Sequence, residues 1–265
     1  MYSFSYLHTT YYILHTTYYL LLTTSSQKVF PMREFDHFLF YAVNMTNNTV
    51  ILDENDTRHA VKVLRLAHGD TFQVSCGDGV IHVCKLSEIS GSCASGIIFD
   101  SKVIQKITPE FNFFVGIPDK DAFESIVTDL TALGVNSITP LISSQCQKNW
   151  WENKWEKHDE RLRGKMISAM KQSLYPYLPV LNKPRILDET CFKNGFCITA
   201  DYDGSSGITL DPSISTINCF IGPPGGFSTD ECDLFRQNGF SFLRLGRTRL
   251  RTELAATAMR CALWQ

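Results

Sequence analysis

The sequence lacks several features that would place it in a common class of protein. No apolar run approaches the ~20 residues of a membrane helix, and none of the nine cysteines forms a C-x-x-C pair. An odd number of scattered cysteines indicates neither a disulfide framework nor a zinc site. We therefore expect a cytoplasmic protein that binds no metal and no membrane, with cysteines as small core residues in a reducing environment.

Four short functional motifs are also absent. The chain contains neither G-x-G-x-x-G nor G-x-x-x-x-G-K-[ST], and neither G-x-S-x-G nor H-E-x-x-H. These absences exclude the usual fingerprints of dinucleotide-binding and P-loop proteins, of α/β-hydrolases and of HExxH zinc enzymes. A nucleotide-like ligand would have to be held in another way.

The overall composition is that of an ordinary globular protein. Of the 265 residues, 44% are hydrophobic and 20% are charged, and the net charge is −2. These values exclude a wholly disordered chain, collagen and a coiled coil, and the length suits one large or two small domains. Because the chain is not a polycation, any nucleic-acid site must be a local patch.

The N-terminal segment differs from the rest of the chain. Residues 1–27 contain no Lys, Arg, Asp or Glu, and the segment Leu7–Tyr12 is repeated as Leu14–Tyr19. A secretory signal needs a basic start and an unbroken apolar run, whereas here Lys28 follows an apolar part that His and Thr interrupt. We interpret residues 1–31 as an extension, either disordered or the result of a start assigned too early. A signal or membrane anchor is the alternative.

Residues 32–106 show the pattern of short strands. Apolar segments follow one another about every ten residues and are separated by turn residues. The turn Gly77–Gly79 lies between two such segments and indicates a hairpin. This spacing predicts a small β-barrel. The expected strands are Phe38–Val43, Val50–Leu52, Thr71–Val74 and Val80–Cys84.

A short helix fits between the second and third of these strands. Its helical spacing would gather His59, Val63 and Leu64 on one side. The opposite side would be basic, with Arg58, Lys62 and Arg65.

Residues 107–265 alternate between strands and helices, which predicts a parallel sheet and an α/β fold. Ser228-Thr229-Asp230-Glu231 is a capping box that opens one helix, and Gly134 stands where another would end. The expected strands are Phe111–Ile117, Ser137–Ile142, Phe196–Ala200, Asn218–Ile221 and Phe242–Leu245, and the other helices are Asp121–Leu133, Trp155–Ser173 and Thr252–Leu263.

A glycine-rich segment, Ile221–Ser228, follows one expected strand. It reads Ile-Gly-Pro-Pro-Gly-Gly-Phe-Ser. Such a rigid turn with few side chains lets backbone groups approach a ligand closely, and the N–H groups of the following helix favour a carboxylate or phosphate. The plainer interpretation is a tight connection between a strand and a helix.

An arginine-rich segment, Leu245–Ala255, follows a second strand. From Arg236 to Arg260 the chain has six arginines and one acidic residue, Glu253. Charge runs are usually solvated and salt-bridged. The sharper hypothesis is a phosphate-binding surface beside a ligand loop, because the guanidinium fork grips phosphate oxygens in pairs.

Shorter motifs upstream belong to the same pattern as these two segments. They are Met32-Arg33, His59-x-x-x-Val63-Leu64-Arg65, Gly69-Asp70, Gly77-Asp78-Gly79, Ile117-Pro118, Leu133-Gly134-Val135 and Ile138-Thr139-Pro140-Leu141. Together with Gly222-Pro223-x-Gly225-Gly226-Phe227-Ser228 and Leu245-Gly246-x-x-x-Leu250-Arg251-Thr252-Glu253, they resemble the ribosomal RNA small subunit methyltransferase E family of the SPOUT class. The resemblance covers about Met32–Gln265.

This resemblance implies a fold, a cofactor and an assembly. A PUA-like RNA-binding barrel over residues 32–106 would precede a SPOUT methyltransferase domain with a trefoil knot over residues 107–265. The chain would form a homodimer through the knot and bind S-adenosylmethionine there. The cofactor-binding residues would be Thr199, Ala200, Ile221, Gly222, Pro223, Gly225, Gly226, Leu245, Gly246, Leu250, Arg251 and Thr252.

The resemblance also implies the reaction, which is methylation of N3 of one uridine in 16S rRNA. Arg251 is the candidate for stabilising negative charge on the uracil or gripping its phosphate. Glu253 could orient Arg251 or accept the proton. The plainer interpretation is an acidic residue that the helix dipole favours in the first turn of the last helix. The rRNA-binding candidates are Arg33, Lys62, Arg65, Arg247 and Arg249.

Several residues depart from the pattern usual in that family. Among them are Asp129, Ala132, Tyr175, Pro224 and Thr248. Two alternatives therefore stay open beside the leading hypothesis. One is a SPOUT methyltransferase with another RNA target, and the other is a non-catalytic RNA-binding or ribosome-assembly protein on the same scaffold.

Overall fold

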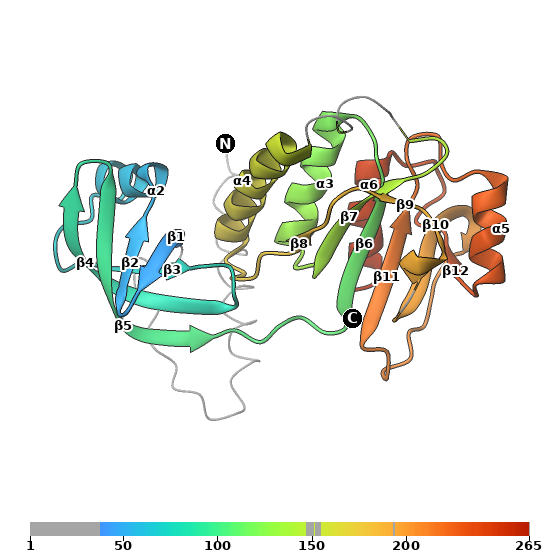
Figure 1. Cartoon of the computed structure of the whole chain (residues 1–265). Helices are drawn as coiled ribbons and strands as arrows, with labels where there is room; N and C mark the ends of the chain where they lie inside the picture. The colour runs from blue at the N-terminus through green and yellow to red at the C-terminus, as the bar shows by residue number, and fades with distance from the viewer. Residues whose placement is uncertain (1–37, 147–150, 152–154, 193, 265) are drawn as a thin grey trace, which may run out of the picture. The chain divides into compact units, whose positions relative to one another are not determined.

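The structure, a computed structural model, describes residues 38–146, 151, 155–192 and 194–264 (Figure 1). The expectations for residues 1–31 and for Arg33 lie outside the described residues. The described chain is mixed α/β and contains a closed barrel and a largely parallel sheet.

The barrel is built from five strands in the order β1-β2-β5-β4-β3. The hairpin at Gly77–Gly79 is confirmed, because β3 and β4 pair antiparallel around it. The sequence did not predict β5 or the extension of β4 beyond Cys84, since that part alternates poorly and is rich in serine. The strands are β1 Leu39–Thr46, β2 Thr49–Leu52, β3 Thr71–Ser75, β4 Val80–Ser90 and β5 Cys93–Val103.

The short helical segment between β2 and β3 starts earlier than its apolar pattern suggests. The helix α2 spans Glu54–Arg58, and its N-cap Asp53 accepts a hydrogen bond from the backbone N–H of Asp56. It continues as a π-helical turn, η1, over His59–Val63. The wider turn breaks the ordinary helical spacing. The expected face is therefore wrong for Val63, which is 65% exposed, whereas Leu64 packs against the barrel core.

The sheet has the order β12-β10-β11-β6-β7-β8, with β9 paired to β7, and these neighbouring strands pair in parallel. The structure confirms the predicted bounds of β7 and α4, while β10 continues to Ser205. Its strands are β6 Glu110–Gly116, β7 Ser137–Ile142, β8 Val180–Leu181, β9 Arg185–Ile186, β10 Phe196–Ser205, β11 Thr216–Ile221 and β12 Ser241–Leu243, and its helices are α3 Lys120–Ala132, α4 Trp155–Ser173, η2 Glu189–Phe192, α5 Thr229–Gln237 and α6 Thr252–Ala262.

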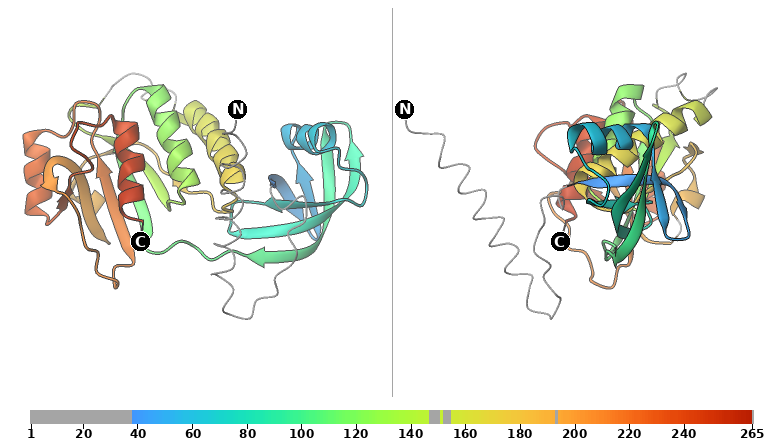
Figure 2. Two further views of the ribbon diagram at one scale, coloured as in Figure 1. Left: turned by 180° about the vertical axis from the view of Figure 1, so that it is seen from behind. Right: turned by 90° about the vertical axis from the view of Figure 1, so that its left-hand side faces the viewer.

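Successive residues of β11 face two separate apolar clusters. Cys219 and Ile221 belong to the larger cluster, which includes residues of α3, α4 and α6. Phe220 between them belongs to a second cluster with Phe235 of α5 and Phe240. The sheet is thus covered on both faces, as parallel sheets require. Figures 1 and 2 show α3 and α6 lying side by side on one face.

Candidate active site

The glycine-rich loop after β11 folds back on itself. The N–H of Gly226 donates to the carbonyl of Pro223 at 2.7 Å, and Gly226 has φ +81°. A Cβ on Gly222 would lie 3.1 Å from the backbone of Gly226. The turn therefore favours glycine at both positions, at Gly226 because of its positive φ and at Gly222 because of the close approach.

A third glycine, which the motifs did not indicate, packs closely against this loop. Gly116 ends β6, and a Cβ there would lie 2.4 Å from the backbone nitrogen of Pro223. Because backbone atoms cannot yield as a flexible side chain does, the loop can occupy its place only if residue 116 has no side chain. The pair Gly116-Ile117 at a strand end was the available signal in the sequence.

The loop leads into α5, and a capping box fixes this junction as predicted. The hydroxyl of Ser228 accepts from the N–H of Glu231, and the Glu231 carboxylate accepts from the N–H of Ser228. The same carboxylate accepts from the N–H of Ser144 at 2.8 Å and from its hydroxyl at 3.0 Å. Glu231 therefore also ties the loop after β7 to the glycine-rich loop, a role that spacing alone could not reveal.

The arginine-rich loop before α6 is joined to the glycine-rich loop at two points. The hydroxyl of Thr252 donates to the carbonyl of Gly222 at 3.1 Å. Arg249 donates from Nη2 to the carbonyl of Pro224 at 3.3 Å. The two motifs, distant in sequence, thus form the walls of one site.

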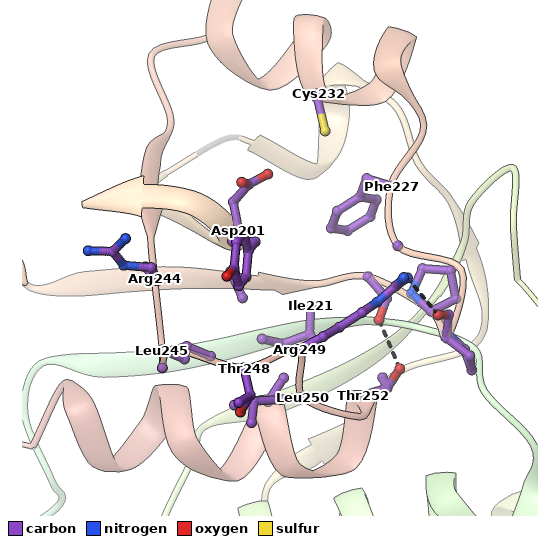
Figure 3. A pocket seen from close by; sticks show the side chains of 18 residues that line it. Asp201, Ile221, Phe227, Cys232, Arg244, Leu245, Thr248, Arg249, Leu250 and Thr252 are labelled. Carbon is purple, nitrogen blue, oxygen red and sulfur yellow. Dashed lines mark hydrogen bonds between the residues drawn. The ribbon is translucent and has the colours of Figure 1, made fainter. Parts of the chain in front are cut away.

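A cavity of about 520 Å³ lies between these loops and residues 200–202 of β10 (Figure 3). Its walls combine apolar side chains, two arginines and backbone groups of both loops. Nine of the twelve residues expected to bind the cofactor line it, namely Ala200, Ile221, Gly222, Pro223, Gly226, Leu245, Gly246, Leu250 and Thr252.

Three of the expected cofactor residues do not line the cavity. Thr199 is buried behind it and donates from its hydroxyl to the carbonyl of Phe220 at 3.2 Å. Gly225 faces away, because a Cβ there would meet the side chain of Gln145. Arg251 projects outward, with its side chain 89% exposed. Contact of any of the twelve residues with a cofactor stays a prediction.

The structure adds residues to the cavity beyond the expected cofactor-binding set. Asp201 and Tyr202 follow the expected end of the strand β10, which was the available signal for both. Cys232 comes from α5, where burial, with a smaller contribution from Asp201, raises the pKa of its thiol. The other additions are Pro224, Phe227, Arg244, Thr248, Arg249 and Ala255.

The candidate catalytic pair lies at the start of α6. Arg251 is the N-cap residue of this helix, and Glu253 lies in its first turn. Nη1 of Arg251 is 4.0 Å from Oε1 of Glu253. The carboxylate is thus close enough to orient the guanidinium, and it also occupies the position that the helix dipole favours.

The basic patch is smaller than the sequence suggests. Arg260 is 1% exposed and lies over the ring of Phe111, with its guanidinium carbon 4.1 Å from the ring centroid. Arg236 is paired with Asp233 at 2.6 Å. The exposed arginines beside the cavity are Arg244, Arg247, Arg249 and Arg251.

Two of the other RNA-binding candidates lie in the segment between β2 and β3. Lys62 and Arg65 are both exposed, and Arg65 has φ +56°.

In the described part of the chain, no group of three or more His, Cys, Asp or Glu side chains is placed to hold a metal ion. Nor is any helix among these residues long and apolar enough to span a membrane.

Comparison with known proteins agrees with this architecture. The family model described as "RNA methyltransferase domain" matches residues 106–264, and that described as "RNA methyltransferase PUA domain" matches residues 52–94. Since the first match covers more than half of the chain, the protein belongs to this RNA methyltransferase family.

Individual relatives carry a more specific name. Ribosomal RNA small subunit methyltransferase E of Aquifex aeolicus is 28% identical over 224 residues, which are 83% of this chain and 96% of the relative. The enzyme of that name from Buchnera aphidicola is 28% identical over 228 residues, which are 82% and 90% of the two chains. The S-adenosylmethionine-bound crystal structure of the Neisseria gonorrhoeae enzyme of the same name has a TM-score of 0.74 at 24% identity, covering 85% of this chain and 96% of the other, and shows a shared fold.

Proposed function

We propose that the protein is an S-adenosylmethionine-dependent methyltransferase that methylates N3 of a uridine in 16S rRNA. The observation that carries this proposal is the cavity lined by the two motif loops, which the Thr252–Gly222 hydrogen bond joins. The chain belongs to an RNA methyltransferase family, and relatives that align with most of its length are named for small-subunit ribosomal RNA.

The residues around the cavity fit a nucleoside cofactor. Close backbone packing at Gly222 and Gly116 keeps side chains out of the loop, so that a ligand can approach its backbone closely. Ile221, Leu245 and Leu250 supply apolar surface for a base. When bound, S-adenosylmethionine supplies an electrophilic methyl group on its sulfonium sulfur. Thr199 contributes indirectly by fixing the carbonyl of Phe220, and Gly225 by leaving space for Gln145.

The chain must also make uridine N3 reactive. An uncharged imide nitrogen is a poor nucleophile, so its proton must leave, and negative charge then develops on the uracil. Arg251 is the residue we assign to stabilising that charge, because it adjoins the cavity-lining residues Leu250 and Thr252 and its guanidinium is exposed to an incoming base. Glu253 orients Arg251 or accepts the proton. Holding the base in line with the methyl group supplies the rest of the acceleration.

Basic residues on both parts of the chain are proposed to bind rRNA phosphates. Arg247 and Arg249 lie beside the cavity, and Lys62 and Arg65 lie on the barrel. The base must be splayed out of its stack to reach the cavity, which suits a single-stranded or loop region of RNA. We further propose that the protein meets this substrate in the cytoplasm.

We also infer a homodimer and a trefoil knot in the sheet domain. Two exposed apolar side chains support the dimer, namely Leu254 in α6, which is 54% exposed, and Trp264 after this helix, which is 59% exposed. Sedimentation velocity measures the oligomeric state, and a monomer would contradict the proposed dimer.

Methyl transfer to ribosomal RNA tests the proposal. The protein is incubated with S-adenosylmethionine carrying a CD3 group and with small subunits or 16S rRNA lacking the modification. Mass spectrometry of the digested rRNA should then find deuterated 3-methyluridine at one site. Labelling of another nucleotide or another RNA would indicate a different target, and no labelling would favour a non-catalytic role.

A further inference from the structure

Asp201 is the one carboxylate among the residues that line the cavity, which otherwise carries the positive charges of Arg244 and Arg249. Two further arginines, Arg247 and Arg251, are exposed nearby. A ligand with net positive charge is repelled by such surroundings. A negative charge inside the cavity is the simplest way to offset that repulsion.

The carboxylate of Asp201 is held in place on one side and open on the other. Its Oδ1 accepts a hydrogen bond from the N–H of Asp203 at 2.8 Å. Among the described residues, none donates a hydrogen bond to Oδ2. In Figure 3 the carboxylate points to the side of the cavity formed by Phe227 and Cys232, whereas Arg249 extends along the opposite side.

The apolar wall strengthens the influence of this charge. Asp201 adds to burial in raising the pKa of the Cys232 thiol, as a carboxylate that points to the same side of the cavity should. Charges beside apolar groups interact more strongly than charges in water, because less solvent screens them. Asp201 is therefore placed to attract a cation that enters between the loops.

We propose that Asp201 is the specificity-determining residue that pairs with the positive charge of the methyl donor. The inference rests on the proposed function, since it concerns the same cavity. S-adenosylmethionine has two cationic groups, a sulfonium and an α-ammonium, and either offers the chemistry that a carboxylate recognises. S-adenosylhomocysteine, the product, keeps only the ammonium. Pairing with the sulfonium would favour the donor over the product.

Calorimetric titration with three ligands tests this assignment. The ligands are S-adenosylmethionine, S-adenosylhomocysteine and 5′-methylthioadenosine, which has the adenosine part but neither cation. The Asp201→Asn variant keeps the Oδ1 acceptor and loses the charge. We expect it to raise the Kd for S-adenosylmethionine about tenfold and that for methylthioadenosine by less than about twofold.

The product ligand identifies which cation is recognised. A similar loss of affinity for S-adenosylhomocysteine assigns the ammonium, and unchanged affinity assigns the sulfonium. Equal losses for all three ligands, or none, would overturn the proposal, because Asp201 would then contact the adenosine part or no ligand at all.

The matched control is Asp203→Asn. It removes the same charge from a side chain that is two residues further along the chain and does not line the cavity. This variant should leave all three dissociation constants unchanged within about twofold. If the unsubstituted protein binds no S-adenosylmethionine, the proposed function itself fails. If it binds and Asp201→Asn binds equally well, only the present inference fails.

Discussion

The side-chain hydroxyl of Thr252 reaches across thirty residues of sequence to donate a hydrogen bond to the carbonyl of Gly222. One residue is the first of the helix α6, and the other is the first of the glycine-rich loop after β11. Thr252 is 4% exposed, so water does not readily replace this bond. The bond makes the arginine-rich and glycine-rich loops a single binding wall.

Replacing this hydroxyl should weaken the wall. Thr252→Val keeps the shape and removes the donor, and we expect a loss of about 1 kcal/mol in the free energy of unfolding. The Kd for S-adenosylmethionine should rise about fivefold. Calorimetry and urea unfolding measure both. Thr257→Val, on the same helix but outside the cavity lining, is the control and should leave the Kd unchanged.

Positive φ at Gly226 should matter for ligand binding as well as for stability. A Cβ at Gly226 or at Gly239 would meet no atom within 4 Å, and both residues have positive φ. Alanine at either position should therefore cost a similar ~1–2 kcal/mol of stability through backbone strain. Only Gly226→Ala should also weaken S-adenosylmethionine binding in a titration. Equal ligand affinity in the two variants would show that the Gly226 turn does not shape the site.

The pair Arg251 and Glu253 should act on the rate of methyl transfer. We expect Arg251→Gln to lower kcat about 100-fold, because a charge that stabilises the reacting base is removed. The Kd for S-adenosylmethionine should stay within about twofold, since Arg251 is exposed and is not among the residues that line the cavity. Glu253→Gln should lower kcat less if it only orients Arg251. Arg236→Gln, whose arginine pairs with Asp233, is the control.

Arg247 should contribute to RNA affinity through phosphate. For single-stranded RNA, removing one phosphate interaction reduces the slope of log K against log salt by about 0.7. Arg247→Gln should therefore weaken binding to 16S rRNA and flatten its salt dependence, as fluorescence titrations at several salt concentrations would measure. A slope equal to that of the unsubstituted protein would remove Arg247 from the RNA surface.

Arg260 should be dispensable for stability. It is buried against Phe111 and Trp264, and among the described residues its Nε and Nη1 have no hydrogen-bond partner. Burial lowers the pKa of its guanidinium. Because an uncompensated buried charge is costly, Arg260→Met should leave the free energy of unfolding unchanged or raise it by about 1 kcal/mol. A loss above about 3 kcal/mol in urea unfolding would mean that the charge has a partner.

The sequence predicted most of the fold because its helices and strands carry strong local patterns. The helix α4 has the bounds that its spacing indicates, and the capping box at Ser228 opens α5 as expected. The strand β5 and the π-helical turn at His59 were missed, because weak alternation and a change of helical period leave no clear local signal. Tertiary packing sets both.

The sequence predicted the site residues that belong to its motifs. It did not predict the residues whose role depends on close packing between distant segments. Gly222 and Leu250 come from motifs, and both line the cavity. Gly116, in contrast, matters only because Pro223 from a distant loop lies against it. Arg260 shows the opposite case, since a residue expected on a basic surface is turned into the core. Such pairings depend on the folded backbone and not on spacing.

The most direct test is a calorimetric titration of S-adenosylmethionine into the full-length protein. A cavity formed by the Gly222 and Thr252 loops for this cofactor predicts saturable binding of one molecule per chain, weakened by Thr252→Val and unaffected by Thr257→Val. Absence of binding at millimolar cofactor would contradict the proposed methyltransferase and favour a protein that binds RNA without modifying it.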